Sequence, residues 1–191
     1  MECNWSRWYT IRMDCANSIN KIKHNLKTLM ATIIITNIIL FCLYNIYIIY
    51  KYGLPTSLSE TAYMLGKKYW LFTVLCLITG FSILPTWFDI GSEDWNFLKF
   101  LSMISLVFTG VTPMFKKELN KPIHYISAII TCVCMLCWLG LSGCWWTLGI
   151  GVGLFILLTI IDYKRVVYYG EICCWLGLLI TLLLYNLLLM M

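Results

Sequence analysis

Charged side chains are scarce in this sequence: Asp, Glu, Lys and Arg make up only 12% of its 191 residues, and it has only 2 histidines. Soluble domains carry about a quarter charged residues. The hydrophobic share is 61% and the mean hydropathy is +0.81. A water-soluble fold of this length cannot bury so much apolar surface, so the composition excludes a soluble enzyme or binding module and predicts an integral membrane protein.

A nucleic-acid partner is also disfavoured, although the net charge is +5. The basic residues sit in short loops beside apolar runs, and no basic patch interleaved with aromatic residues is present. Basic residues beside membrane spans are typical of contacts with anionic lipid headgroups. We therefore expect membrane lipids as partners and no nucleic acid.

The 10 cysteines do not form the pattern of a disulfide framework. Seven lie inside apolar runs, where cysteine serves as a small apolar filler: Cys42, Cys76, Cys132, Cys134, Cys137, Cys173 and Cys174. Cys134 and Cys137 have the spacing of a zinc or redox pair, but no second pair accompanies them. The sequence predicts no metal site and no cofactor.

The apolar runs predict an all-α protein: an integral membrane six-helix bundle over residues 28–191. The expected spans are 29–50, 69–87, 97–115, 123–141, 146–161 and 172–190, because a membrane helix needs about 20 apolar residues. Residues 1–27 are expected to form a separate amphipathic helix at the membrane surface. There Ile19, Ile22 and Leu26 recur at helical spacing, opposite Lys23 and Lys27.

Small and polar residues inside the spans predict how the helices pack. Asn37 and Asn45 are expected to face neighbouring helices rather than lipid. Gly149 and Gly153 form a GxxxG pattern, which predicts close packing on a neighbouring helix and possible helix–helix self-association. The very short turn 142–144 predicts a tight antiparallel pair of spans on either side of it.

Orientation stays open from charge alone. Loops one, three and five (residues 51–68, 116–122 and 162–171) hold eight Lys and Arg residues, and the terminal side holds five or six, depending on Lys99. The positive-inside rule does not separate these counts. A basic N-terminal tail is costly to translocate, which favours cytoplasmic termini. The expected location is the inner or plasma membrane of a bacterium.

Loops one, three and five share a face of the bundle, and their polar residues form the candidate site: Ser57, Ser59, Glu60, His124 and Asp162. Basic residues on the same face are candidates for headgroup binding: Lys67, Lys68, Lys164 and Arg165. Three interpretations remain open. Glu60 and His124 form a structural hydrogen bond, or the face binds an anionic lipid headgroup. In the third, Glu60, His124 and Asp162 hold a metal or act as acid and base on a lipid ester.

Two short motifs in these loops resemble a known group. Loop one carries Ser59-Glu60 with Gly66 before the second span, and the fourth span opens His124-Tyr125-x-x-Ala128. With six spans, this resembles the Frag/DRAM/Sfk type of membrane proteins and a related bacterial six-span family of unknown function. In that type loop one carries Ser-acid-x-Gly; in this chain the glycine is displaced, and only Glu118 stands for the acid that commonly precedes the histidine.

The resemblance implies cytoplasmic termini, with Glu60 and His124 on the outer face, and some relatives are linked to lipid-anchor remodelling or lipid handling. The leading functional prediction is a lipid-associating multi-pass membrane protein that uses the polar face of loops one, three and five. The alternatives are a lipid-modifying, hydrolase-like membrane enzyme at the same site and a small-molecule transporter. Hydrolases of the alkaline-ceramidase type use several histidines, and this chain has only His24 and His124.

Overall fold

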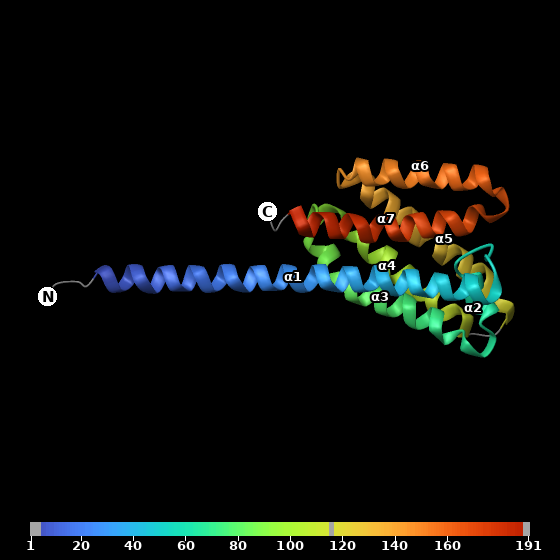
Figure 1. Cartoon of the computed structure of the whole chain (residues 1–191), viewed down its shortest axis with the longest axis horizontal. Helices are drawn as coiled ribbons and strands as arrows, with labels where there is room; N and C mark the ends of the chain where they lie inside the picture. The colour runs from blue at the N-terminus through green and yellow to red at the C-terminus, as the bar shows by residue number, and fades with distance from the viewer. Residues whose placement is uncertain (1–4, 115–116, 189–191) are drawn as a thin grey trace.

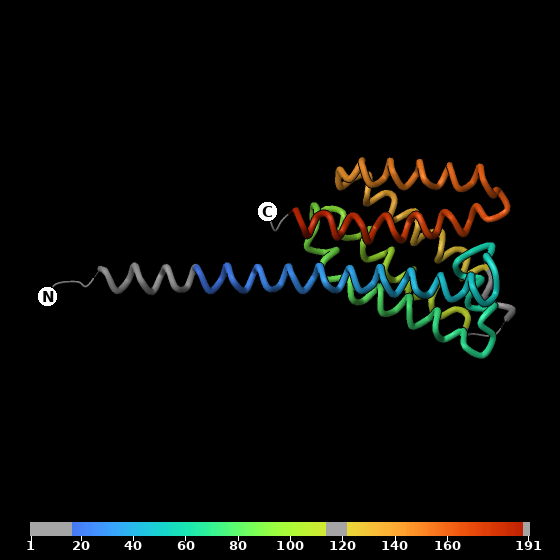
Figure 2. Tube along the Cα trace, in the orientation of Figure 1, coloured from blue at the N-terminus to red at the C-terminus, as the bar shows by residue number. Residues whose placement is uncertain are grey.

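The computed structural model of the chain describes the backbone of residues 5–114 and 117–188 and the side chains of residues 17–113 and 122–188, and these residues form helices without strands. The long helices run roughly alongside one another (Figures 1 and 2). They are α1 (Trp5–Tyr52), α3 (Trp70–Asp89), α4 (Asn96–Val111), α5 (Lys117–Leu141), α6 (Trp145–Ile161) and α7 (Val166–Leu188). A short helix, α2 (Glu60–Met64), lies in loop one. The predicted all-α helical bundle is confirmed.

The helices have the length and composition of membrane spans. In the described part of the chain, four stretches are long and apolar enough to cross a membrane: Asn17–Tyr52, Gly66–Asp89, Pro122–Leu141 and Tyr163–Leu188. α6 is a shorter apolar helix, and the 16 residues of α4 rise about 24 Å against a hydrocarbon core of about 30 Å. A multi-pass membrane protein is supported, and six crossings stay a prediction.

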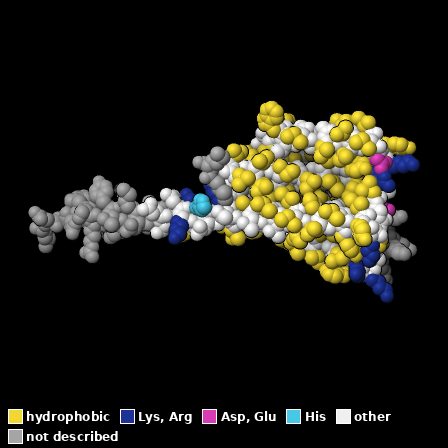
Figure 3. All heavy atoms as spheres, viewed as in Figure 1, with side chains coloured by type: hydrophobic (Ala, Val, Ile, Leu, Met, Phe, Trp, Pro, Cys, Tyr) yellow, Lys and Arg dark blue, Asp and Glu magenta, His cyan; other side chains and the backbone are white. Residues whose placement is uncertain are grey.

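The outer surface of the bundle is apolar, as a lipid-facing surface requires. Large hydrophobic side chains point outward on every long helix; for example, Phe81 is 61%, Phe100 57% and Ile160 76% exposed. Figure 3 shows this apolar belt over the bundle, with charged side chains gathered at its ends and on the projecting part of α1. In water such a surface would drive aggregation, so the exposed side chains favour a lipid environment.

α1 differs from the sequence prediction because it does not break near residue 27. It runs as one helix of 48 residues, and its first half extends beyond the bundle (Figure 1). Residues 17–26 on that extension are exposed. The predicted division between a surface helix, 1–27, and a first span has no break in the backbone to mark it. A position of this segment at the membrane surface stays a prediction.

Polar side chains in α1 face the other helices, as predicted for Asn37 and Asn45. Asn37 is 2% exposed and its Nδ2 donates to Ser82 Oγ at 2.8 Å. Asn45 is 7% exposed and its Oδ1 accepts from Tyr168 Oη at 3.0 Å. Phe41, between them, stacks on Trp175 with ring centroids 5.1 Å apart. These contacts fix α1 against α3 on one side and α7 on the other.

Glycines make room for α3 and α4 to lie close together. A Cβ at Gly110 would lie 2.7 Å from Cys76 Cβ, and one at Gly80 would lie 2.8 Å from Met103 Cε. Thr73 Oγ1 uses this proximity to donate to Gly110 O at 2.6 Å. Small residues therefore set the α3–α4 distance, as in other membrane helix pairs.

The GxxxG pattern on α6 does not bring α6 close to another of the described helices. A Cβ at Gly149 or Gly153 meets nothing within 4 Å, and both glycines are exposed. The prediction that this face packs closely on a neighbour is wrong for the described part of the chain, and packing on a second copy stays a prediction. The expected tight pair around residues 142–144 is also wrong, because α6 leans mainly on α7.

Alanine substitution separates the two kinds of glycine. Gly110→Ala should lower the free energy of unfolding by about 1–3 kcal/mol, because the new methyl group overlaps Cys76 Cβ on a helix that has to move away. Gly149→Ala is the matched control and should leave stability unchanged or slightly higher, since alanine is the better helix former. Thermal unfolding in detergent measures both; equal melting temperatures would contradict the α3–α4 packing.

Candidate functional site

Loop one, the start of α5 and the turn between α6 and α7 lie at the same end of the bundle (Figure 1), as the sequence predicts. Glu60 opens α2 there, and its Oε2 accepts hydrogen bonds from Thr56 N and Thr56 Oγ1, both at 2.6 Å. The Thr56 hydroxyl and then the Thr56 N–H hold the pKa of Glu60 below its ordinary value of 4.5. Glu60 therefore stabilises the local conformation of loop one.

His124 lies in the interface between α4 and α5. It is 4% exposed, and its Nδ1 is 3.0 Å from Thr112 Oγ1. Its Nε2 is buried with no hydrogen-bond partner among the described residues. Within the described part of the chain, the predicted hydrogen bond between Glu60 and His124 is absent. Glu60 is instead hydrogen-bonded to Thr56, and His124 to Thr112.

Below His124, hydroxyl groups join α4 to α5 turn by turn. Thr109 Oγ1 donates to Ser127 Oγ at 3.0 Å, and Ser102 Oγ donates to Thr131 O at 3.3 Å. Hydrogen bonds of this kind hold helices together where lipid gives no hydrophobic drive. His124 is the outermost member of this hydroxyl ladder, which gives it a structural role.

The remaining predicted residues form the rim. Asp162 pairs with Arg165, and Arg165 Nε donates to Leu54 O at 3.2 Å. Ser57 Oγ accepts from Glu60 N and lies 3.1 Å from Ser59 Oγ. Exposed cations on the same rim are Lys67, Lys68 and Lys164. Arg165 is thus engaged in holding loop one, whereas contact of these three lysines with lipid headgroups stays a prediction.

Loop one is strapped along the beginning of α7. Three hydrogen bonds join every second residue of the loop to every third residue along α7 and the turn just before it. Arg165 Nε donates to Leu54 O, and Tyr168 N donates to Thr56 O at 3.1 Å. Leu58 N donates to Glu171 Oε2 at 2.6 Å. The Tyr168 N–H lies in the first turn of α7, where it has no acceptor within the helix. The extended loop supplies that acceptor.

Glu171 is a candidate site residue that the sequence analysis missed. The expected sixth span began at Ile172, which left Glu171 outside it as part of a polar turn. In the structure α7 already begins at Val166, so the carboxylate lies inside a spanning stretch. An ionisable group within a span is a functional-site signal, and an earlier helix start would have revealed it.

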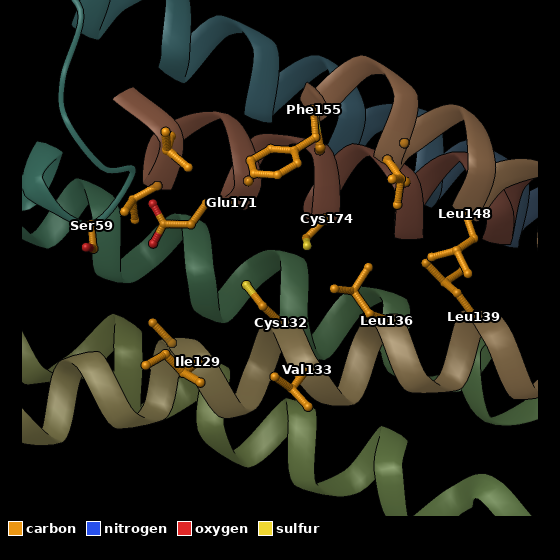
Figure 4. A pocket seen from close by; sticks show the side chains of 18 of the residues that line it. Ser59, Ile129, Cys132, Val133, Leu136, Leu139, Leu148, Phe155, Glu171 and Cys174 are labelled. Carbon is orange, nitrogen blue, oxygen red and sulfur yellow. The ribbon is translucent and has the colours of Figure 1, made fainter. Parts of the chain in front are cut away.

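Glu171 lines a cavity of about 380 Å³ between α5, α6 and α7. The walls are almost entirely apolar, and Figure 4 shows the carboxylate at one end beside Ser59, with Phe155, Val133 and Leu136 further along. Lining residues Ile129 and Val133 are 60% and 51% exposed, so the cavity opens sideways to the surroundings of the bundle. The opening exists because α6 leans on α7 and touches α5 only lightly.

The cavity has the chemistry of a binding site for an amphiphile. Small-molecule sites are typically apolar clefts of about 300–1,000 Å³ with a few placed polar groups. In this cavity Glu171 and Ser59 are polar groups at the end nearest loop one, and the lining also includes Tyr125 and Thr147. Among the described residues, no three His, Cys, Asp or Glu side chains come together as a metal-binding group.

Comparison with known proteins adds no assignment. No protein-family model matches the chain, and no curated protein or solved structure matches it. The resemblance of Ser59-Glu60 and His124-Tyr125-x-x-Ala128 to the Frag/DRAM/Sfk type therefore stays a prediction. The geometry of the cavity and its rim is what points to a function.

The lowered pKa of Glu60 predicts that the folded protein loses stability in acid. Because its pKa is lower in the folded chain, the Glu60 carboxylate stabilises the fold above about pH 4.5 and loses this effect as the pH falls through the folded pKa. Glu60→Gln should lower the melting temperature at pH 7 and flatten its fall in acid. Glu93→Gln, an exposed carboxylate at the other end of the bundle, is the control and should keep the wild-type pH profile.

His124→Ala tests the structural role of the imidazole. Loss of the contact with Thr112 should lower the free energy of unfolding by roughly 0.5–2 kcal/mol, the usual range for a hydrogen bond between membrane helices. Ile126→Ala, which removes a side chain that is 58% exposed, should change it by less than about 0.5 kcal/mol. A His124→Ala variant that melts like the wild type would contradict the hydroxyl ladder.

Proposed function

We propose that this multi-pass membrane protein binds a lipid or another membrane-dissolved amphiphile in the cavity between α5, α6 and α7. The apolar part of the ligand lies along the cavity, and its polar end reaches Glu171 and Ser59. The observation that carries the proposal is a sideways-opening apolar cavity with one carboxylate at its end. A ligand enters such a cavity from the bilayer without crossing water.

The state of Glu171 supports a ligand with a hydrogen-bonding end. Its Oε2 accepts from Leu58 N, and no hydrogen bond within the described residues occupies Oε1. Glu171 is half-buried, so its second oxygen is free to accept a hydrogen bond from a ligand hydroxyl, amine or amide. The rim lysines Lys67, Lys68 and Lys164 add an attraction for anionic headgroups of the surrounding bilayer.

Binding is favoured over the enzyme alternative because the predicted catalytic side chains have separate partners. Glu60 is held by Thr56, His124 by Thr112 and Asp162 by Arg165. General acid–base chemistry on a lipid ester needs an acid and a base within reach of one substrate atom. The contacts of these three groups instead stabilise the loop and the helix pairs.

Filling the cavity tests the proposal with a matched pair of variants. Gly151 lines the cavity and has free space at its Cβ; Gly149, two residues away on α6, has the same free space but is exposed and is not part of the lining. Gly151→Leu should reduce the bound ligand at least about tenfold, equivalent to about 1.4 kcal/mol. Gly149→Leu should bind like the wild type.

The measurement is native mass spectrometry of the full chain released from vesicles of phosphatidylethanolamine and phosphatidylglycerol. The expected spectrum shows a retained adduct on the wild type and on Gly149→Leu, and little on Gly151→Leu. An adduct with the mass of a phospholipid identifies lipid as the source, whereas a smaller adduct identifies a lipophilic metabolite. Equal adducts on both glycine variants would contradict binding in this cavity.

A further inference from the structure

Two cysteines face each other across the cavity. Cys132 projects from α5 and Cys174 from α7, and Figure 4 shows their sulfur atoms directed toward one another. Both cysteines are free, and both line the cavity. The sequence analysis singled out Cys134 and Cys137 instead, but Cys134 is buried and Cys137 is exposed.

One carboxylate lines the cavity near this pair. Glu171 lies three residues before Cys174 on the same face of α7, and it is the only carboxylate among the described residues that line the cavity. A thiol reacts as its thiolate, so the part open to Glu171 is that of a base that takes the proton from a thiol.

We propose that Cys132 and Cys174 are a redox-active dithiol that reduces a lipid-soluble quinone bound in the cavity. This inference rests on the proposed function, because it names the class of amphiphile that the cavity takes. The quinone ring lies beside the two thiols and Glu171, and its apolar tail extends toward Leu136 and Leu148. The product is a Cys132–Cys174 disulfide.

The reaction balances in atoms and electrons. Two S–H bonds break and one S–S bond forms, which releases two electrons and two protons. The quinone accepts both electrons, and both of its carbonyl oxygens become hydroxyl groups. Glu171 accepts a proton from the thiol that reacts first and returns it to a quinone oxygen. A reductant, such as a second dithiol, has to regenerate the two thiols by thiol–disulfide exchange.

The position of the thiols explains why the oxidant has to be lipophilic. Cys174 is 8% exposed, and the space in front of both sulfur atoms is the apolar cavity, which opens toward the bilayer. A water-soluble oxidant would have to leave water to reach them. A quinone with an alkyl tail is an apolar molecule that takes up two electrons and two protons, which matches what a dithiol releases.

The test uses the full chain, reduced and kept without oxygen, in phosphatidylcholine nanodiscs with one equivalent of decylubiquinone. Loss of the quinone absorbance measures reduction, and peptide mass mapping locates the disulfide. We expect one quinol per chain and a Cys132–Cys174 linkage. Cys132→Ser and Cys174→Ser should abolish both, and Glu171→Gln should slow quinol formation about tenfold, equivalent to about 1.4 kcal/mol of activation free energy.

Cys137→Ser is the matched control, because Cys137 lies on α5 like Cys132 but is exposed and does not line the cavity. It should reduce quinone like the wild type. Gly151→Leu should block quinone reduction while diamide, a small oxidant, still links the two cysteines, so a folding defect is recognised by loss of both. Linkage through Cys173, or diamide linkage in the wild type without any quinol, overturns the inference. Ligand loss in Gly151→Leu alone would still support the proposed function.

Discussion

The hydrogen bond from Leu58 N–H to the Glu171 carboxylate joins the two parts of the molecule on which the candidate site depends. It is 2.6 Å long and connects residues 113 positions apart in sequence. Together with the contacts of Arg165 and Tyr168, it straps loop one onto α7 and closes the end of the cavity. The same carboxylate thus fixes the loop and keeps its other oxygen free of any hydrogen bond with the described residues.

The packing of the rest of the bundle follows from the apolar surroundings that its outer surface requires. Lipid-facing positions are apolar, and the interior holds many of the hydroxyl groups, such as Ser102, Thr109 and Thr131. Hydrogen bonds between α4 and α5, and glycines between α3 and α4, therefore bring those three helices close together. Among the residues whose side chains are described, α6 has neither such hydrogen bonds to α5 nor glycines packed closely against it, and it contains no buried residue. It therefore stands away from α5 and leaves the cavity open.

Composition and apolar runs were enough to predict the helical class, the positions of most helices and the inward-facing Asn37 and Asn45. The continuity of α1 was not predictable from Lys21, Lys23 and Lys27, because charges do not stop a helix; they only make a membrane position costly. The packing of α6 was also missed, since a GxxxG pattern shows that close approach is possible and not which partner is present.

The cavity shares Ser59 with the predicted candidate residues, whereas its carboxylate, Glu171, was not among them. Sequence reasoning paired Glu60 with His124 because loops one and three meet at one face, whereas side-chain partners depend on distances of a few ångströms. Glu60 is satisfied by Thr56, four residues away, and His124 by Thr112 across the α4–α5 junction. Glu171 escaped notice because the last span was predicted to begin at Ile172, six residues after α7 begins at Val166.

The central claim, that the cavity between α5, α6 and α7 is a ligand site ending at Glu171, is tested most directly by a density map of the protein in a lipid bilayer. The account predicts elongated density between the three helices, with one end within hydrogen-bond distance of the Glu171 carboxylate. A map in which α6 closes onto α5 and leaves no space for a ligand would contradict it.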